Sequence, residues 1–126
     1  MVECLIAIPC LFCVEFNNDN WKGKVFKRIE NLKFLYESGL YEFLFNEFPG
    51  ATLFLFGSYS NGDDSANSDI DLAVIGLKER KINLEKFEKM FGKKIMLQFY
   101  LSLKDINKNL RENILNGIIL KGGVEL

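Results

Sequence analysis

The alternation of hydrophobic and polar residues predicts two helices in the first half of the chain. Apolar side chains recur at helical spacing over residues 25–36, and Ser38 and Gly39 end that run with a plausible C-cap. A second helical stretch covers residues 40–48 and stops at the Pro-Gly pair that follows it. The polar run NNDN at residues 17–20 separates these helices from the apolar start of the chain.

Short, continuous apolar runs predict the strands. The first is ATLFLF at residues 51–56, the second is DIDLAVI at 69–75, and the third is KIMLQFYL at 94–101. The second is apolar on both faces beyond Asp71, so it is expected to be central in its sheet. Helices are expected near residues 84–91 and over 103–115, with a short last strand in GIILKG. This order predicts an α/β fold in which helices pack on a small sheet.

Length and charge narrow the class of protein. A chain of 126 residues with 48% hydrophobic residues supports one globular core. The net charge of −1 argues against a broad basic face for binding nucleic acid. A local basic cluster is interpreted as the solvated side of a helix. It consists of Lys22, Lys24, Lys27 and Arg28.

The residue types that are absent or rare exclude several chemistries. The chain has no histidine, which excludes His-dependent triads and nearly every zinc site. Its three cysteines, Cys4, Cys10 and Cys13, include one C-x-x-C spacing, but no second pair completes a metal site. We interpret them as buried, inert thiols in a reducing compartment, and a redox pair is the alternative.

The apolar start of the chain is too short to span a bilayer. Residues 2–14 are interrupted by Glu3 and Pro9, and they lack the basic region and cleavage site of a secretory signal. We therefore expect a soluble, cytoplasmic protein with no membrane partner. Residues 1–20 are predicted to be an N-terminal appendage of uncertain structure, and residues 21–126 the folded domain.

Two carboxylates lie at the start of the second predicted strand. Side chains alternate along a strand, so Asp69 and Asp71 are expected to project from the same face. Two ionised carboxylates so near each other repel unless a cation lies between them. Mg²⁺ prefers such oxygen ligands, together with substrate phosphates. The simpler interpretation, in which both residues are merely solvated at the start of a strand, applies to an isolated D-x-D.

A Gly-Ser pair ends the preceding strand and changes that interpretation. Gly57 permits close approach of the backbone to a phosphate, and Ser58 adds a hydroxyl donor. One strand end thus supplies hydrogen-bond donors to a phosphate, and the neighbouring strand end supplies metal ligands. Enzymes that transfer phosphorus groups need both kinds of group. We interpret the intervening Asp63, Asp64 and Ser65 as turn formers without a catalytic role.

The stretch GSYSNGDDSANSDIDLAVI resembles the signature of the minimal nucleotidyltransferases of the DNA polymerase β superfamily, in which G-S, a spacer and D-x-D are followed by apolar residues. The resemblance is close over residues 56–75. It implies that Gly57 and Ser58 bind the nucleoside triphosphate (NTP). It also implies that Asp69 and Asp71 are catalytic residues that bind Mg²⁺ or Mn²⁺.

The same resemblance implies a fold and an activity. The expected fold is nucleotidyltransferase-like, with a small mixed β-sheet packed with helices. The expected reaction moves a nucleoside monophosphate (NMP) from an NTP such as ATP to a hydroxyl of a protein or small molecule. Similar single-domain proteins form the antitoxin-like half of pairs with a HEPN-type toxin, so the resemblance implies such a protein partner or self-association.

One position departs from the family pattern. Active members usually carry a third carboxylate on the strand after D-x-D, whereas here Gln98 is the only central polar residue and is the candidate for the third position. Asp105 lies beyond that strand, where helix capping is the simpler interpretation. The base is absent, supplied by the substrate, or unnecessary if a metal lowers the pKa of the hydroxyl. The alternative function is a non-catalytic nucleotide- or protein-binding module.

Overall fold

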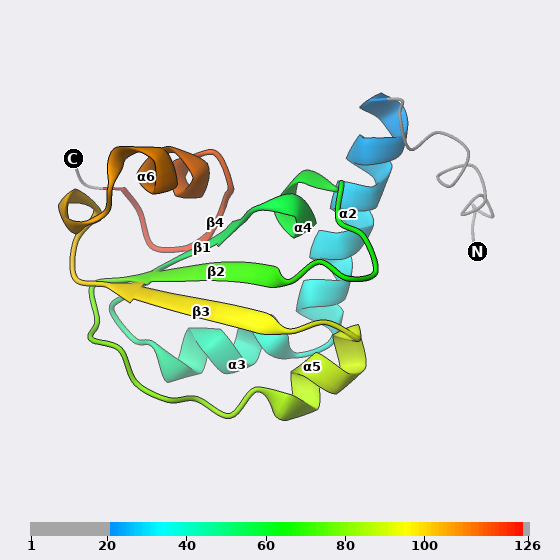
Figure 1. Cartoon of the computed structure of the whole chain (residues 1–126). Coiled ribbons are helices and arrows are strands. Elements are labelled where there is room, and N and C mark those ends of the chain that lie inside the picture. The colour runs from blue at the N-terminus through cyan, green and yellow to red at the C-terminus, as the bar shows by residue number, and fades with distance from the viewer. Residues whose placement is uncertain (1–20, 125–126) are drawn as a thin grey trace.

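The computed structural model describes residues 21–124 (Figure 1). The appendage and the three cysteines lie outside the described residues. The described part of the chain begins with helix α2 (Trp21–Glu37), which is followed by α3 (Leu40–Glu47). Gly39 joins the two helices with a φ of 89°, a left-handed conformation that glycine tolerates. No helix in the described part of the chain is both long and apolar enough to cross a membrane.

Within residues 21–124, four strands form one mixed sheet, as expected. They are β1 (Thr52–Phe56), β2 (Ile70–Ile75), β3 (Ile95–Tyr100) and β4 (Ile118–Lys121), and their order is β3-β2-β1-β4. Strand β2 is parallel to β3, whereas β1 is antiparallel to both β2 and β4. The prediction that β2 is internal is confirmed, because its neighbours cover both of its edges.

Each face of the sheet buries its own apolar cluster, because side chains alternate along the strands. Leu53 and Leu55 face the larger cluster, on the side of α2, α3 and α5 (Glu85–Phe91). Phe54 and Phe56 face the smaller cluster, on the side of α6 (Lys108–Leu115). Figure 1 shows α6 on one side of the sheet and both α3 and α5 on the other. These contacts confirm the α/β fold class.

The helix expected over residues 103–115 is broken, and that prediction was wrong. A short 3₁₀ helix, η1 (Leu103–Asp105), is followed by Ile106 in an extended conformation. Helix α6 begins only after Asn107, whose side chain accepts a hydrogen bond from the Leu110 N–H at 2.9 Å. Asparagine is favourable at an N-cap, where its side chain binds a free backbone N–H, and less favourable inside a helix. Asn107 therefore has the capping role expected of Asp105.

Candidate functional site

The turn after β1 lies against the start of β2. The antiparallel register places Phe56 opposite Asp71, and a four-residue helix, α4 (Ser58–Asn61), begins directly after Gly57. A Cβ atom built on Gly57 would lie 2.6 Å from an oxygen of the Asp71 carboxylate. Gly57 also has φ 81° and ψ −162°, a region that essentially only glycine occupies. Space and conformation both require glycine here.

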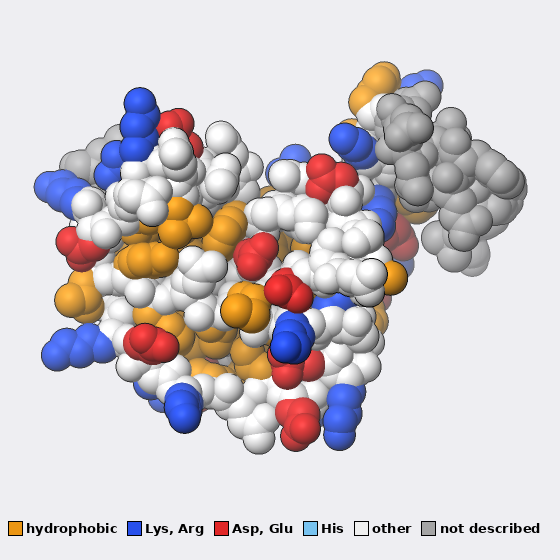
Figure 2. Space-filling model, viewed as in Figure 1, with side chains coloured by type: hydrophobic (Ala, Val, Ile, Leu, Met, Phe, Trp, Pro, Cys, Tyr) orange, Lys and Arg blue, Asp and Glu red, His pale blue; other side chains and the backbone are white. Residues whose placement is uncertain are grey.

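Asp71 and Asp69 differ in their surroundings. Asp71 lies inside β2 and is half-buried, whereas Asp69 lies just before the strand and is exposed. Burial, and then the neighbouring charge of Asp69, raise the pKa of the Asp71 carboxyl above its ordinary value. Figure 2 shows acidic side chains on the surface over the start of β2. Two carboxylates that repel each other fit a hard divalent cation, which would relieve the repulsion.

The raised pKa of Asp71 predicts how cation binding depends on pH. A carboxylate binds a cation only when it is ionised, so Mn²⁺ affinity should fall as the pH is lowered through the raised pKa of Asp71. The fall should begin at a higher pH than for an ordinary aspartate. Calorimetric titration of Mn²⁺ between pH 8 and pH 4 measures this effect. Affinity that stays constant over the whole range would contradict it.

The same shift has the opposite consequence for stability without metal. Because the folded-state pKa of Asp71 is raised, its contribution to stability is present at low pH and is lost as the pH rises through that pKa. Replacing Asp71 by Asn removes this loss. The melting temperature of the metal-free variant should therefore decline less between pH 4 and pH 7 than that of the wild type.

Gly57 and Ser58 present polar groups next to the two aspartates. The Gly57 carbonyl accepts hydrogen bonds from the Ser60 hydroxyl at 2.8 Å and from the Asn61 N–H at 3.2 Å. Within residues 21–124, no hydrogen-bond partner is found for the Ser58 hydroxyl, which is half-buried. This hydroxyl can therefore donate to a phosphate oxygen without breaking a contact of the protein.

The strand after D-x-D places Met96, not Gln98, beside Asp71. In the parallel register, Asp71 pairs with Met96, and Gln98 pairs with Ala73 one step further along the same face. Met96 is 43% exposed, and Gln98 accepts a hydrogen bond from the Tyr100 hydroxyl at 3.0 Å. In the described part of the chain, no three acidic or cysteine side chains gather closely enough to hold a metal ion. Neither Met96 nor Gln98 supplies a third carboxylate.

Sequence reasoning missed Asp64, which was interpreted as a turn residue. Its side chain is 5% exposed, and the ammonium groups of Lys27 and Lys93 lie 3.4 and 3.3 Å from its two oxygens. Lys27 is therefore not only part of a solvated helix face. An acidic residue in a polar loop carries no periodic signal that could have predicted its burial.

Comparison with known proteins agrees with this geometry. The family described as polymerase beta, nucleotidyltransferase, matches residues 40–124, which include the whole of the sheet and every site residue named above except Lys27. No curated protein and no solved structure matches the chain. The family match covers more than half of the sequence, and the motif that suggested it lies where β1 and β2 meet. The chain therefore belongs to the polymerase beta nucleotidyltransferase family.

Proposed function

We propose that the protein is a metal-dependent nucleotidyltransferase that moves NMP from an NTP, such as ATP, to a hydroxyl of a protein or small molecule. The observation that carries this proposal is the contact between Gly57 and Asp71. In this contact the backbone of the candidate phosphate-binding turn lies directly against Asp71, one of the two candidate metal ligands. A nucleotide whose phosphates meet the Gly57-Ser58 turn would lie within reach of both aspartates.

Each candidate residue has a specific task in this reaction. The backbone at Gly57 and the hydroxyl of Ser58 would bind phosphate oxygens and orient the nucleotide. Asp69 and Asp71 would hold one or two divalent cations, Mg²⁺ or Mn²⁺, by their carboxylate oxygens. When bound, these ions neutralise charge on the phosphates during the displacement.

In this transfer one bond to phosphorus forms and one breaks, so no oxidant or reductant is needed. The acceptor oxygen forms a bond to the α-phosphorus, and the bond from that phosphorus to the bridging oxygen of the β-phosphate breaks. Pyrophosphate leaves with the electron pair of that bond. The proton of the acceptor hydroxyl passes to water, because the β3 residue beside Asp71 is Met96, which cannot accept it.

The acceptor in this proposal is bound by another molecule. Within residues 21–124, one sheet and its covering helices form a single unit, with no second domain in that range. We therefore propose a protein partner, of the HEPN toxin type implied by the sequence resemblance, or a second copy of the chain. The nucleotide substrate and the expected reduced cysteines favour action in the cytoplasm.

A second candidate function is a binding module that holds nucleotide and metal without transferring NMP. One observation favours it, namely Met96 at the position on β3 where a third carboxylate would lie beside Asp71. This module would retain the affinity of the two-aspartate site and lack turnover. The two functions share the same binding site and differ only in product.

Titration of ATP, and then of the other NTPs, into the wild-type protein with and without Mg²⁺ tests the binding site common to both functions. We expect binding that requires the metal, because the phosphates and the aspartates are both anionic. Detection of pyrophosphate in the presence of a partner or a second copy then separates the enzyme from the binding module. No NTP binding at millimolar Mg²⁺ would overturn both functions.

A further inference from the structure

A buried ionic network lies beneath the loop that joins the Gly-Ser turn to the two aspartates. The Asp64 carboxylate lies between Lys27 of α2 and Lys93, which precedes β3. The Asn31 side chain, also in α2, donates a hydrogen bond to an oxygen of the same carboxylate at 2.8 Å. Lys27 additionally donates to the backbone carbonyl of Asp64. Parts of the chain far apart in sequence thus converge on one loop residue.

Burial of this carboxylate demands that its partners stay in place. An ionised group removed from water is costly unless opposite charges and hydrogen-bond donors surround it. Asp64 meets that requirement in the observed loop conformation, in which one oxygen faces Lys27 and Asn31 and the other faces Lys93. The network therefore restricts where the loop can lie relative to α2 and β3.

The restriction extends along the loop to Asp69. Besides its ion pair with Asp64, Lys93 donates a hydrogen bond to the carbonyl of Ser65. The Ser65 N–H donates to the Ser68 hydroxyl at 2.9 Å, and the Ser68 N–H donates back to the Ser65 carbonyl at 3.1 Å. Ser68 directly precedes Asp69 in the chain. Contacts that hold Ser65 and Ser68 thereby hold the backbone of the exposed aspartate.

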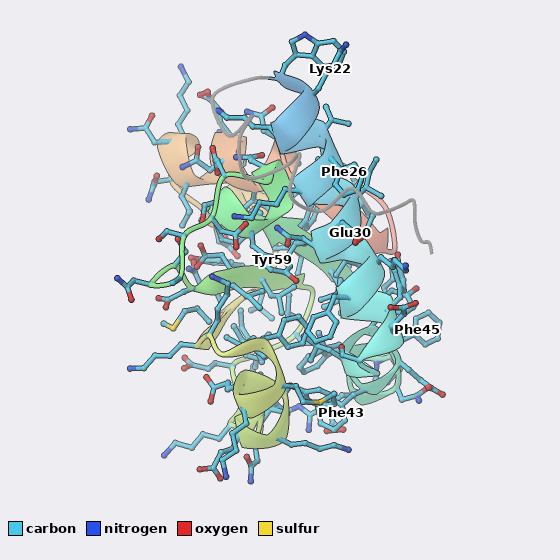
Figure 3. All side chains as sticks on the ribbon, turned by 90° about the vertical axis from the view of Figure 1, so that its right-hand side faces the viewer. Lys22, Phe26, Glu30, Phe43, Phe45 and Tyr59 are labelled. Atoms are coloured by element: carbon cyan, nitrogen blue, oxygen red, sulfur yellow. The ribbon has the colours of Figure 1, made fainter. Side chains whose placement is uncertain are left out.

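The restriction also extends in the opposite direction, to the Gly-Ser turn. The Asn31 amide that binds Asp64 also donates to the carbonyl of Tyr59 at 3.0 Å, and the Tyr59 hydroxyl donates to the Asn31 carbonyl at 3.1 Å. Tyr59 follows Ser58 in α4 and lies beside α2 (Figure 3). Burial, and then the charge of Asp64, raise the pKa of Tyr59, so its hydroxyl stays a donor.

We propose that Asp64 and Asn31 are positioning residues that hold the phosphate-binding turn and the metal-binding aspartates at a fixed separation. The inference rests on the proposed nucleotide and metal site. Within residues 21–124, neither residue forms a hydrogen bond or ion pair with Gly57 or Asp69, so each acts through the backbone that it holds. Asn31 lies before residues 40–124, the range that matches the family. Helix α2 thus adds a support for the site from outside the matched segment.

Three variants test this proposal. D64N removes the buried charge, and N31A removes the amide donors while leaving both ion pairs intact. E47Q is the matched control, because Glu47 at the end of α3 also pairs with a cation, Arg80 at 3.7 Å, but this pair is more exposed than that of Asp64 and involves the loop after the end of β2. We expect D64N and N31A to weaken the affinity for Mn²⁺-ATP by about tenfold or more, the typical effect of losing an outer support of a metal site. E47Q should leave it unchanged.

The measurement must separate positioning from general destabilisation. Affinity is determined well below the melting temperature of each variant, and the electron paramagnetic resonance spectrum of bound Mn²⁺ reports the symmetry of its ligands. Positioning predicts an altered spectrum in a variant that is fully folded, which a purely structural role would not produce. If D64N does not fold, N31A decides the question.

The outcomes distinguish this inference from the proposed function. Wild-type protein that binds no Mn²⁺-ATP overturns the proposed site itself, and the positioning role falls with it. Wild-type protein that binds Mn²⁺-ATP, together with a folded D64N or N31A variant of unchanged affinity and spectrum, overturns the positioning role alone.

Discussion

Replacing Asp69 and Asp71 together by Asn is expected to lower the rate of NMP transfer by about 1,000-fold or more while the protein stays folded. Loss of a single preorganised electrostatic group already costs about 100- to 1,000-fold in comparable sites. The double change removes both anionic cation ligands. The fold should survive because Asp69 is exposed and Asp71, whose carboxyl has a raised pKa, gains nothing from being ionised without metal.

A pyrophosphate-release assay measures the loss, and circular dichroism checks the fold. D63N is the matched control, since Asp63 is an exposed aspartate of the same loop and its side chain forms no hydrogen bond or ion pair within residues 21–124. It should retain wild-type activity. A folded double variant that keeps more than a tenth of the wild-type rate would show that the two aspartates are not the metal ligands.

Replacing Met96 by Asp is expected to raise the transfer rate, by about 100-fold if the new carboxylate serves as general base. The parallel register places residue 96 directly beside Asp71, and the Met96 side chain is 43% exposed. A carboxylate can therefore enter without displacing the core. It would accept the proton of the acceptor hydroxyl, which no β3 side chain beside Asp71 can accept in the wild type.

Two further variants make the effect of M96D specific. M96N adds a polar group of similar size that cannot take a proton, so it should not raise the rate. Q98D adds a carboxylate beside Ala73, one step further along β3, so it should have little effect. Activation by Q98D and not by M96D would show that residue 98, as the sequence analysis suggested, is the third position of the site.

The binding module makes a separate prediction from the same variants. If the wild type binds nucleotide and metal without turnover, M96D should convert a silent site into an active one. If the wild type is already an enzyme, M96D should increase a measurable rate. Comparing the two rates under one set of conditions therefore distinguishes the functions proposed above.

Local patterns in the sequence predicted most of the fold. The strands were predicted because each is a short, continuous apolar run, and their positions agree with β1, β2 and β3 to within a residue. The broken helix after β3 was not predicted. The helical spacing of apolar residues continues through Asn107. The start of α6 is decided by whether the Asn107 side chain caps a new helix or the backbone continues the preceding one.

The candidate site also has residues that the sequence predicted and residues that it did not. Gly57, Ser58, Asp69 and Asp71 were found from the sequence because their spacing is a local motif, and their roles remain predictions. The neighbour of Asp71 on β3 could not be predicted from the sequence, because it depends on the register between the two strands. A shift of one residue in that register moves every side chain to the other face, and a shift of two residues places Gln98 instead of Met96 beside Asp71.

The sequence by itself determined the order of helices and strands, the family signature and the residues that carry it, because these depend on neighbours along the chain. Only the tertiary structure decided that Met96 lies beside Asp71 and that Asp64 is buried between Lys27 and Lys93. Both depend on segments more than twenty residues apart, whose pairing is set by packing of the whole core rather than by local preference.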